Sequence, residues 1–346
     1  MENWKRSLAD SITTPSDLPS RFAVDPKPLQ DVAHLFPMRI TPYYLGLIRQ
    51  PGDPIWLQCV PDILELSGDL FSDPLNETGL SPVPGLIHRY PDRVVWLVSS
   101  ACAVYCRFCM RKGRVGCHNG GDKTADSNEI IEYITRNRAI RDVILSGGDP
   151  LLLDDDALES LLVRLRKIPH VEIIRIGTRT PVTLPERVTV PLCTMLKRYH
   201  PLFVNTHFNH PLEITEESAR ACARLADAGI PLGNQTVLLR GVNDQPQTMK
   251  RLMQQLLMMR VRPYYIHQMD LVRGTGHFRT AVMRGLEIMK GLRGHTSGLA
   301  NPHYMIDLPG GKGKVPIAPE SVEWDGRNLF LRNFLGEVIE YKDVEE

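Results

Sequence analysis

From residue 94 onward, short β-rich runs alternate with amphipathic helical patterns, and this alternation constrains the fold more than any other feature of the sequence. The β-rich runs occupy residues 94–99, 142–146, 172–177, 202–207, 233–239 and 262–268. Helical patterns lie between and after them, near residues 127–138, 156–167, 189–199, 215–228, 246–260 and 281–293. Strands that alternate with helices at intervals of roughly thirty residues are typical of parallel strands joined by crossover helices.

The predicted fold class is therefore α/β, a partial (β/α)6 TIM-like barrel. A doubly wound open sheet is the alternative, but no G-x-G-x-x-G motif follows the first strand. Residues 1–85 carry many prolines and short helical patterns and are expected to form an N-terminal helical cap, followed by the barrel over residues 86–300. Residues 301–346 are expected to hold a glycine-rich lysine loop and a C-terminal β-hairpin that turns near Gly336.

Composition excludes several classes of protein. The 346 residues are 42% apolar and 23% charged, which is typical of a soluble globular enzyme. A net charge of +1 gives no reason to expect nucleic acid or an anionic membrane as a partner. No apolar run is long enough to span a bilayer, and no apolar stretch follows the first residues as it would in a signal peptide. Seven cysteines, three of them clustered, fit a reducing compartment, so the expected location is cytoplasmic.

Three cysteines form one tight C-x3-C-x2-C run after the first predicted strand: Cys102, Cys106 and Cys109. This spacing brings three thiolates to one side of a loop, where they can hold three corners of a [4Fe–4S] cluster. A fourth cysteine at a matching distance is absent, so one iron would keep an open coordination position. A zinc ion with a distant fourth ligand such as His118 is one alternative. Ordinary buried thiols are the other.

An open iron can bind the amino and carboxylate groups of S-adenosylmethionine and pass it an electron, which yields a deoxyadenosyl radical. The sequence Ser-Gly-Gly-Asp-Pro at residues 146–150 follows the second predicted strand and fits this partner. Its glycines let backbone approach a ligand closely, and the carboxylate of Asp149 can hold an ammonium group. The alternative interpretation is a simple turn from strand to helix.

A second dense motif occupies residues 307–316, where glycines alternate with Lys312 and Lys314. It lacks the Ser/Thr and the spacing of a nucleotide-binding P-loop. A lysine held in a confined loop can instead form a Schiff base with pyridoxal phosphate. Judged by itself, the motif favours a flexible surface loop with solvated lysines.

Taken together, these motifs resemble those of the lysine 2,3-aminomutase family, which are radical S-adenosylmethionine, pyridoxal-phosphate enzymes. The resemblance runs in order from about residue 84 to the hairpin, through residues 86–94, 102–111, 146–150, 205–210, 239–244, 262–266, 276–280, 292–298 and 309–314. Residues 4–18 also resemble the short members of the family that are linked to modification of elongation factor P.

The resemblance implies a set of cofactor-binding residues. It assigns the [4Fe–4S] cluster to Cys102, Cys106 and Cys109, and the aldimine of pyridoxal phosphate to Lys314 rather than to Lys312, which replaces a common glycine. S-adenosylmethionine would be held by five residues: Gly147, Gly148, Asp149, His207 and Gln235. The pyridoxal ring and phosphate would be surrounded by three more: Arg89, Tyr90 and Arg93.

The resemblance also implies a substrate and a reaction. Arg111 would pair with the substrate α-carboxylate, while Asp270 and Asp307 would receive the side-chain ammonium. The implied enzyme is an isomerase that converts L-lysine to L-β-lysine by 1,2-amino migration on the pyridoxal-phosphate aldimine. A glutamate or arginine 2,3-aminomutase is an alternative, although glutamate would place an anion against both aspartates. A cluster-bearing sensing module is a further alternative, but such a module would give no role to Arg111, Asp270, Asp307 and Lys314.

The implied partners are L-lysine and an external electron donor of the flavodoxin or ferredoxin type, and a homodimer is left open. An aminomutase that serves elongation factor P is a variant of the same function. Long members of the family use a cysteine directly after a Gly-Val-Asn-Asp run, together with cysteines in a C-terminal extension, to hold zinc. Gln245 occupies that position here and no cysteine follows Cys222, so a short form with no zinc is expected.

Overall fold

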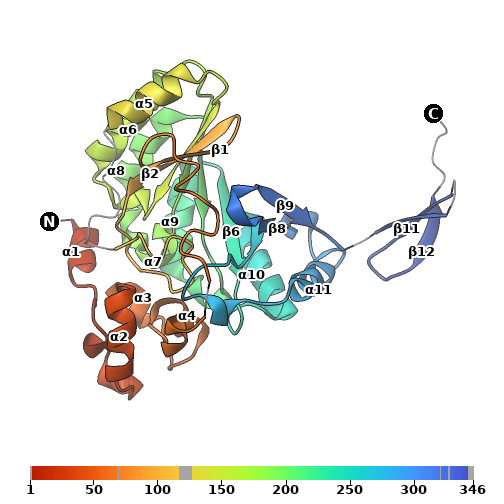
Figure 1. The fold of residues 1–346 in the computed structure, drawn as a ribbon, viewed down its shortest axis with the longest axis horizontal. Helices are drawn as coiled ribbons and strands as arrows, with labels where there is room; N and C mark the ends of the chain where they lie inside the picture. The colour runs from red at the N-terminus through yellow and green to blue at the C-terminus, as the bar shows by residue number, and fades with distance from the viewer. Residues whose placement is uncertain (1, 69, 117–126, 320, 326–327, 342–346) are drawn as a thin grey trace.

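A computed structural model describes residues 2–68, 70–116, 127–319, 321–325 and 328–341 (Figure 1). Its centre is a nine-stranded sheet in which every strand pairs with the next one along the chain. The strands are β1 (Leu86–Tyr90), β2 (Arg93–Ser99), β3 (Asp142–Gly147), β4 (Ile173–Gly177), β5 (Leu202–Thr206), β6 (Leu232–Leu238), β7 (Val261–Gln268), β8 (His303–Asp307) and β9 (Lys314–Ile317).

Strands β2 to β7 are the six strands that the sequence predicts, and all of them pair in parallel. The predicted α/β fold with a partial TIM-like barrel is therefore confirmed. Three further strands extend the sheet beyond this prediction. β8 adds in parallel to β7, whereas β1 and β9 pair antiparallel at the two edges. The sheet thus continues through β8 and β9 into the segment that carries the lysine loop.

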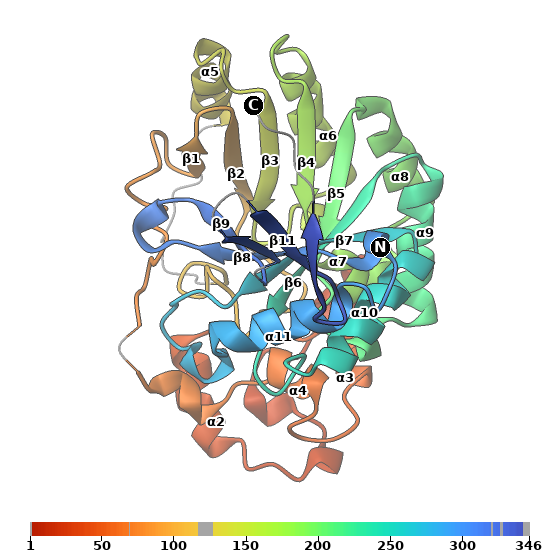
Figure 2. The ribbon, with the colours of Figure 1, turned by 90° about the vertical axis from the view of Figure 1, so that its right-hand side faces the viewer.

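Helices cover the outer face of the strands, as Figure 2 shows. They are α5 (Ser127–Arg136), α6 (Asp155–Arg166), α8 (Val190–Leu196), α9 (Glu216–Asp227), α10 (Pro246–Met258) and α11 (Val282–Leu292). Local sequence explains their ends: the Thr215 side chain accepts a hydrogen bond from the Ser218 amide at the start of α9, and Gly229 follows its end with a φ of 77°. None of the helices in the described ranges is long and apolar enough to cross a membrane.

The main core lies between the sheet and these helices. In β3 and β4, alternate residues such as Val143, Leu145 and Ile176 are fully buried and belong to the same apolar cluster as Leu158 of α6. Successive side chains in a strand point to opposite faces. The residues between them, Arg175 for example, therefore face the inside of the barrel, where the site described below is located.

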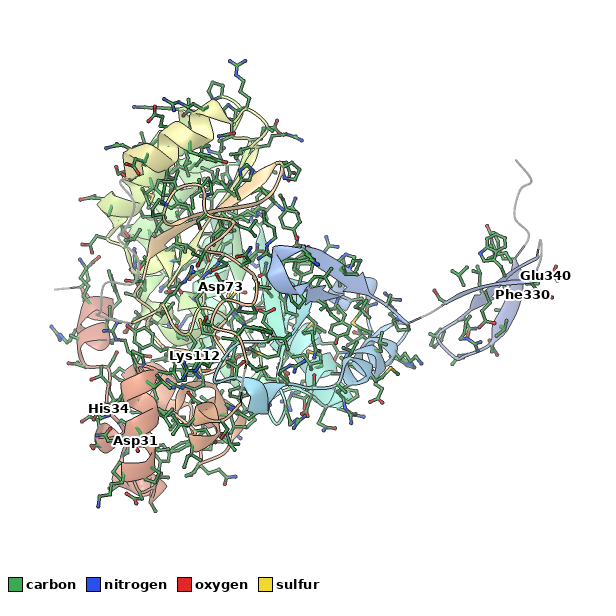
Figure 3. The ribbon with its side chains drawn as sticks, in the orientation of Figure 1. Asp31, His34, Asp73, Lys112, Phe330 and Glu340 are labelled. Carbon is green, nitrogen blue, oxygen red and sulfur yellow. The ribbon has the colours of Figure 1, made fainter. Side chains whose placement is uncertain are left out.

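The N-terminal cap consists of short helices at one end of the sheet (Figure 1): α1 (Asn3–Ala9), α2 (Lys27–Leu35), α3 (Pro42–Gly46) and α4 (Pro54–Cys59). Figure 3 places Asp31 and His34 on α2, away from the sheet. The other side of the cap meets the barrel, because the buried Tyr44 hydroxyl of α3 donates to Glu213 over 2.7 Å. The cap therefore contributes polar groups to the barrel end.

A small antiparallel sheet follows the main one and projects away from it (Figures 1 and 2). It comprises β10 (Val322–Asp325), β11 (Asn328–Arg332) and β12 (Val338–Tyr341). The expected C-terminal hairpin is confirmed as β11 and β12, which pair Phe330 with Glu340 around the turn at Gly336 (Figure 3). β10 adds a third strand that the sequence analysis did not predict.

Candidate active site

The loop after β2 carries the three clustered cysteines, all of them half-buried. Burial, Asp149 and the other two thiols raise the pKa of Cys102, and burial with Cys106 raises the pKa of Cys109 to about 11. The charges of the three thiols therefore disfavour one another's ionisation. Such buried thiols become thiolates when a cation or a metal cluster compensates their charge.

Three thiols on one loop are compatible with a cluster. Within the described part of the chain, no three His, Cys, Asp or Glu side chains converge to hold one metal ion. Each cysteine of an iron–sulfur cluster binds a different iron, so its ligands do not need to converge on one point. His118, the fourth ligand of the zinc alternative, lies outside the described residues.

The cysteine loop is anchored to the cap through buried charges. Glu65, in the cap, accepts hydrogen bonds from Arg107 over 2.8 and 2.5 Å and pairs with Lys112 over 2.6 Å. Burial and Arg107 lower the pKa of Lys112 to about 8. Figure 3 shows Lys112 beside the cap. A carboxylate from the cap therefore holds both flanks of the segment that contains Cys109.

Gly147 and Gly148 allow the end of β3 to approach the cysteine loop. A Cβ atom on Gly147, which has a φ of 120°, would lie 2.3 Å from the Ser99 carbonyl oxygen. One on Gly148 would lie 2.3 Å from the Ala101 carbonyl oxygen. The sequence predicts that some group approaches these glycines closely. In the structure, that group is the backbone of the cysteine loop itself, directly beside Cys102.

Asp149 is buried and has several donors within the chain. It accepts hydrogen bonds from the Thr178 hydroxyl over 2.6 Å, the Arg179 amide over 2.8 Å and the Leu151 amide over 3.0 Å. Burial raises the pKa of Asp149 despite these donors. The carboxylate thereby ties the end of β3 to the loop that follows β4.

Arg179 connects the cysteine loop, the barrel and the cap. Its Nη1 donates to Cys106 Sγ over 2.8 Å, and its Nε donates to the His207 carbonyl over 3.2 Å. Its Nη2 lies within hydrogen-bond distance of three buried acceptors: Glu213 Oε1 at 2.6 Å, Gln58 Oε1 at 2.6 Å and the Tyr44 hydroxyl at 3.0 Å. The sequence analysis did not single out this residue, although its position directly after a predicted strand was the available signal.

His207 lies at the end of β5 and is neutral in this environment. Burial, Arg179 and His267 lower its pKa to about 3. Its Nε2 is buried and has no hydrogen-bond partner among the residues that the structure describes, and its ring packs edge-on against Phe108 with centroids 5.5 Å apart. A buried, unpaired ring nitrogen beside the cysteine loop suits contact with a polar ligand. Gln235 lies on the neighbouring strand β6, next to a register irregularity.

Lys314 and the three residues expected near the pyridoxal group lie together. Lys314 begins β9, pairs with Asp307 of β8, and its ammonium contacts the Asp307 carboxylate. Arg89 donates to the other oxygen of Asp307 over 3.0 Å. The Tyr90 hydroxyl accepts from the Lys314 amide over 2.9 Å, and the Arg93 guanidinium stacks 3.8 Å from the Tyr90 ring centroid. Lys312, by contrast, is exposed.

The two aspartates expected at the substrate ammonium share one buried region. Burial and the charge of Asp307 raise the pKa of Asp270 to about 7. A cavity of about 240 Å³ opens beside both carboxylates, and its walls include Leu75, Gln268 and Thr280. Two buried carboxylates next to a small cavity form a site for a cationic group.

Arg111 already has a partner in this structure. Its guanidinium forms a two-point pair with Glu77, with Nε 2.9 Å from Oε2 and Nη2 2.7 Å from Oε1, and its Nη1 donates to the Ser146 hydroxyl over 3.3 Å. Glu77 belongs to the loop before β1, and no motif in the sequence marks it. Only the fold brings it to Arg111.

Comparisons with known proteins show what the chain is similar to. The model of the Radical SAM superfamily matches residues 96–253, and the model described as Lysine-2,3-aminomutase matches residues 289–346. The chain is 54% identical to L-lysine 2,3-aminomutase of Fusobacterium nucleatum, over 89% of this chain and 74% of that protein. It is 50% identical to L-lysine 2,3-aminomutase of Acetoanaerobium sticklandii, over 99% and 85%. It is also 45% identical to glutamate 2,3-aminomutase of Clostridioides difficile, over 99% and 82%.

Proposed function

Because this chain belongs to the lysine 2,3-aminomutase family and is a radical S-adenosylmethionine aminomutase, we propose that its substrate is L-lysine and its product L-β-lysine. Pyridoxal phosphate on Lys314 is part of the proposal. The family also contains a protein named for glutamate, so overall similarity does not choose the substrate. The choice rests on the side chains of the site.

The observation that carries the proposal is the shared buried region of Asp270 and Asp307. Their mutual repulsion, added to burial, holds the pKa of Asp270 at about 7. A substrate ammonium between them would relieve the repulsion and stabilise both carboxylates. The side-chain carboxylate of glutamate would add a third negative charge at the same place, which disfavours it strongly.

The residues of the site have separable roles in this proposal. Cys102, Cys106 and Cys109 would hold the cluster, and Lys314 would hold pyridoxal phosphate. When bound, the cluster and S-adenosylmethionine supply a hydrogen-abstracting radical, and the pyridoxal ring supplies a π system that spreads the unpaired electron. An electron donor of the flavodoxin or ferredoxin type would reduce the cluster.

The contact between Lys314 and Asp307 suggests how the site changes before substrate binds. In the structure, the Lys314 ammonium contacts the Asp307 carboxylate. Lys314 would hold pyridoxal phosphate through the same nitrogen, and Asp307 would keep Arg89 at 3.0 Å as its partner. Asp307 then joins Asp270 in receiving the substrate ammonium, and Arg111 takes the α-carboxylate through its remaining donors.

The test is turnover by the anaerobically reconstituted enzyme with lysine and glutamate in parallel, followed by product analysis. We expect β-lysine as the main product. Asp307→Asn should lower kcat/KM for lysine by orders of magnitude, because removing one partner of a buried charge contact costs roughly 2–5 kcal/mol. Faster turnover of glutamate than of lysine by the unaltered protein would refute the proposal.

A further inference from the structure

We propose that Glu77 is a positioning residue that keeps Arg111 on the α-carboxylate side of the substrate site and away from the aspartates. This inference rests on the proposed function, because it concerns how the same site recognises the two charged ends of lysine. It adds a residue that comes from the loop before β1 rather than from the barrel.

The ion pair leaves part of Arg111 available. A guanidinium has five N–H donors arranged along two edges. Glu77 occupies the edge formed by Nε and Nη2, at 2.9 and 2.7 Å. The edge that includes Nη1 is occupied only in part, by the Ser146 hydroxyl at 3.3 Å, which is a long hydrogen bond. A substrate carboxylate can therefore approach along the Nη1 edge without displacing Glu77.

Glu77 is itself held in place. Its amide donates to Asp73 over 2.9 Å, and Asp73 also accepts from the Thr78 amide over 2.9 Å, so the carboxylate of Asp73 closes the turn that carries Glu77. Figure 3 places Asp73 on this loop in front of the sheet. Arg114 lies 3.6 Å from Glu77 Oε2 and 3.5 Å from Asp73 Oδ2. With only 5% of its surface exposed, Glu77 is a fixed anchor.

The anchor matters because the site contains two other carboxylates. Asp270 and Asp307 border one cavity, and they would attract a guanidinium that had lost its own anion. Without Glu77, the Arg111 guanidinium would have no buried anion to fix its orientation. The site would then lose its carboxylate-binding end. Glu77 thus keeps the two ends of the site separate, as a zwitterionic substrate requires.

Glu77→Gln tests this inference because it keeps the size of the side chain and removes its charge. Binding to the anaerobic holoenzyme is measured by calorimetry with two probes, lysine and cadaverine, the diamine left when lysine loses its carboxylate. We expect lysine affinity to fall roughly ten- to hundredfold, the range for losing hydrogen bonds to a charged group. Cadaverine affinity should change much less, so the preference for lysine over cadaverine should largely disappear. KM for lysine should rise more than kcat falls.

Glu132→Gln is the matched control, because it makes the same chemical change in an exposed ion pair, the one with Arg136 on the outer helix α5. It should bind both probes as the unaltered protein does, and the iron content of all variants should be equal. The inference is overturned if Glu77→Gln keeps the preference for lysine over cadaverine, or if it weakens both probes equally. A different result, in which the unaltered protein neither binds nor converts lysine, would instead refute the proposed function.

Discussion

Lys314 and Asp307 face each other across the antiparallel pair formed by β9 and β8, and their charged groups are in direct contact. Arg89 reaches the same carboxylate from β1, at the opposite edge of the sheet. The barrel thus brings its first and last strands together around one aspartate. A lysine in this position is confined by its neighbours, which is what a lysine that binds a carbonyl cofactor needs.

The first prediction concerns this lysine. Borohydride reduction of the protein loaded with pyridoxal phosphate should place the label on Lys314, because its ammonium contacts Asp307, which Arg89 also holds, and its amide donates to the Tyr90 hydroxyl. Lys314→Ala should lose turnover while retaining the cluster, as seen by visible absorbance and iron content. Lys312→Ala is the control and should behave as the unaltered protein. Peptide mapping that finds the label on Lys312 would contradict the assignment.

The second prediction concerns the cysteine loop. Cys106→Ala should abolish reductive cleavage of S-adenosylmethionine, because two thiolates cannot hold the cluster that supplies the electron. The same result is expected for Cys102 and Cys109. Cys222→Ala is a suitable control, since Cys222 is buried on α9 within the main apolar core. Cys59 and Cys193 should also be dispensable. Full cleavage by Cys106→Ala would exclude its role as a ligand.

The third prediction concerns Arg179, which donates to Cys106 Sγ and adds a positive charge beside it. Hydrogen bonds to the sulfurs and local charge help to set the reduction potential of an iron–sulfur cluster. Removing the Arg179 hydrogen bond and its positive charge should make the reduction potential of the cluster more negative. The variant to compare is Arg179→Met combined with Glu213→Gln, which avoids leaving a buried carboxylate unpaired. Spectroelectrochemical titration measures the shift against Glu213→Gln alone, and an unchanged potential would show that the contact is only structural.

The fourth prediction is a pH dependence from Asp270, whose pKa is raised to about 7 by burial and by Asp307. Binding of a substrate ammonium requires the carboxylate form. In the unaltered protein, ionisation of Asp270 should therefore make kcat/KM for lysine rise with pH up to about 7. Above that pH, Asp270 should cause no further change. Asp270→Asn should remove that limb of the profile while lowering activity throughout. A profile whose acid limb survives in Asp270→Asn would assign the limb to another group.

The raised pKa of Asp270 also affects the stability of the fold. A carboxyl group whose pKa is higher in the folded state than in the unfolded chain stabilises the fold below the unfolded pKa, and this contribution is lost as pH rises through the folded value. The free energy of unfolding of the apoprotein should thus lose this contribution between the ordinary pKa of aspartate and about pH 7. Asp270→Asn should be more stable than the unaltered apoprotein above that pH, which denaturant titration at several pH values can measure.

Local sequence was sufficient to predict the parallel strands β2 to β7, because each is an apolar run followed by an amphipathic helix. The strands β8 and β9 were missed for a physical reason. They are short, and β9 contains Pro316 and lies at the edge of the sheet, where it pairs with β8. β1 pairs at the opposite edge and likewise has no helix after it.

The sequence by itself determined the candidate chemistry of this protein. The three cysteines lie within one short loop, so their spacing alone predicts a cluster, whereas Lys314 is assigned through the resemblance of its glycine-rich turn to that of the family. The tertiary structure decided what surrounds them. Cys106 meets Arg179, which is 73 residues away, and Arg111 meets Glu77, which is 34 residues away in the loop before the barrel. Such partners contact each other only because β/α packing brings distant loops to the same end of the barrel. No local sequence pattern predicts which buried charged side chains will pair, because the pairing depends on the closure of the whole sheet.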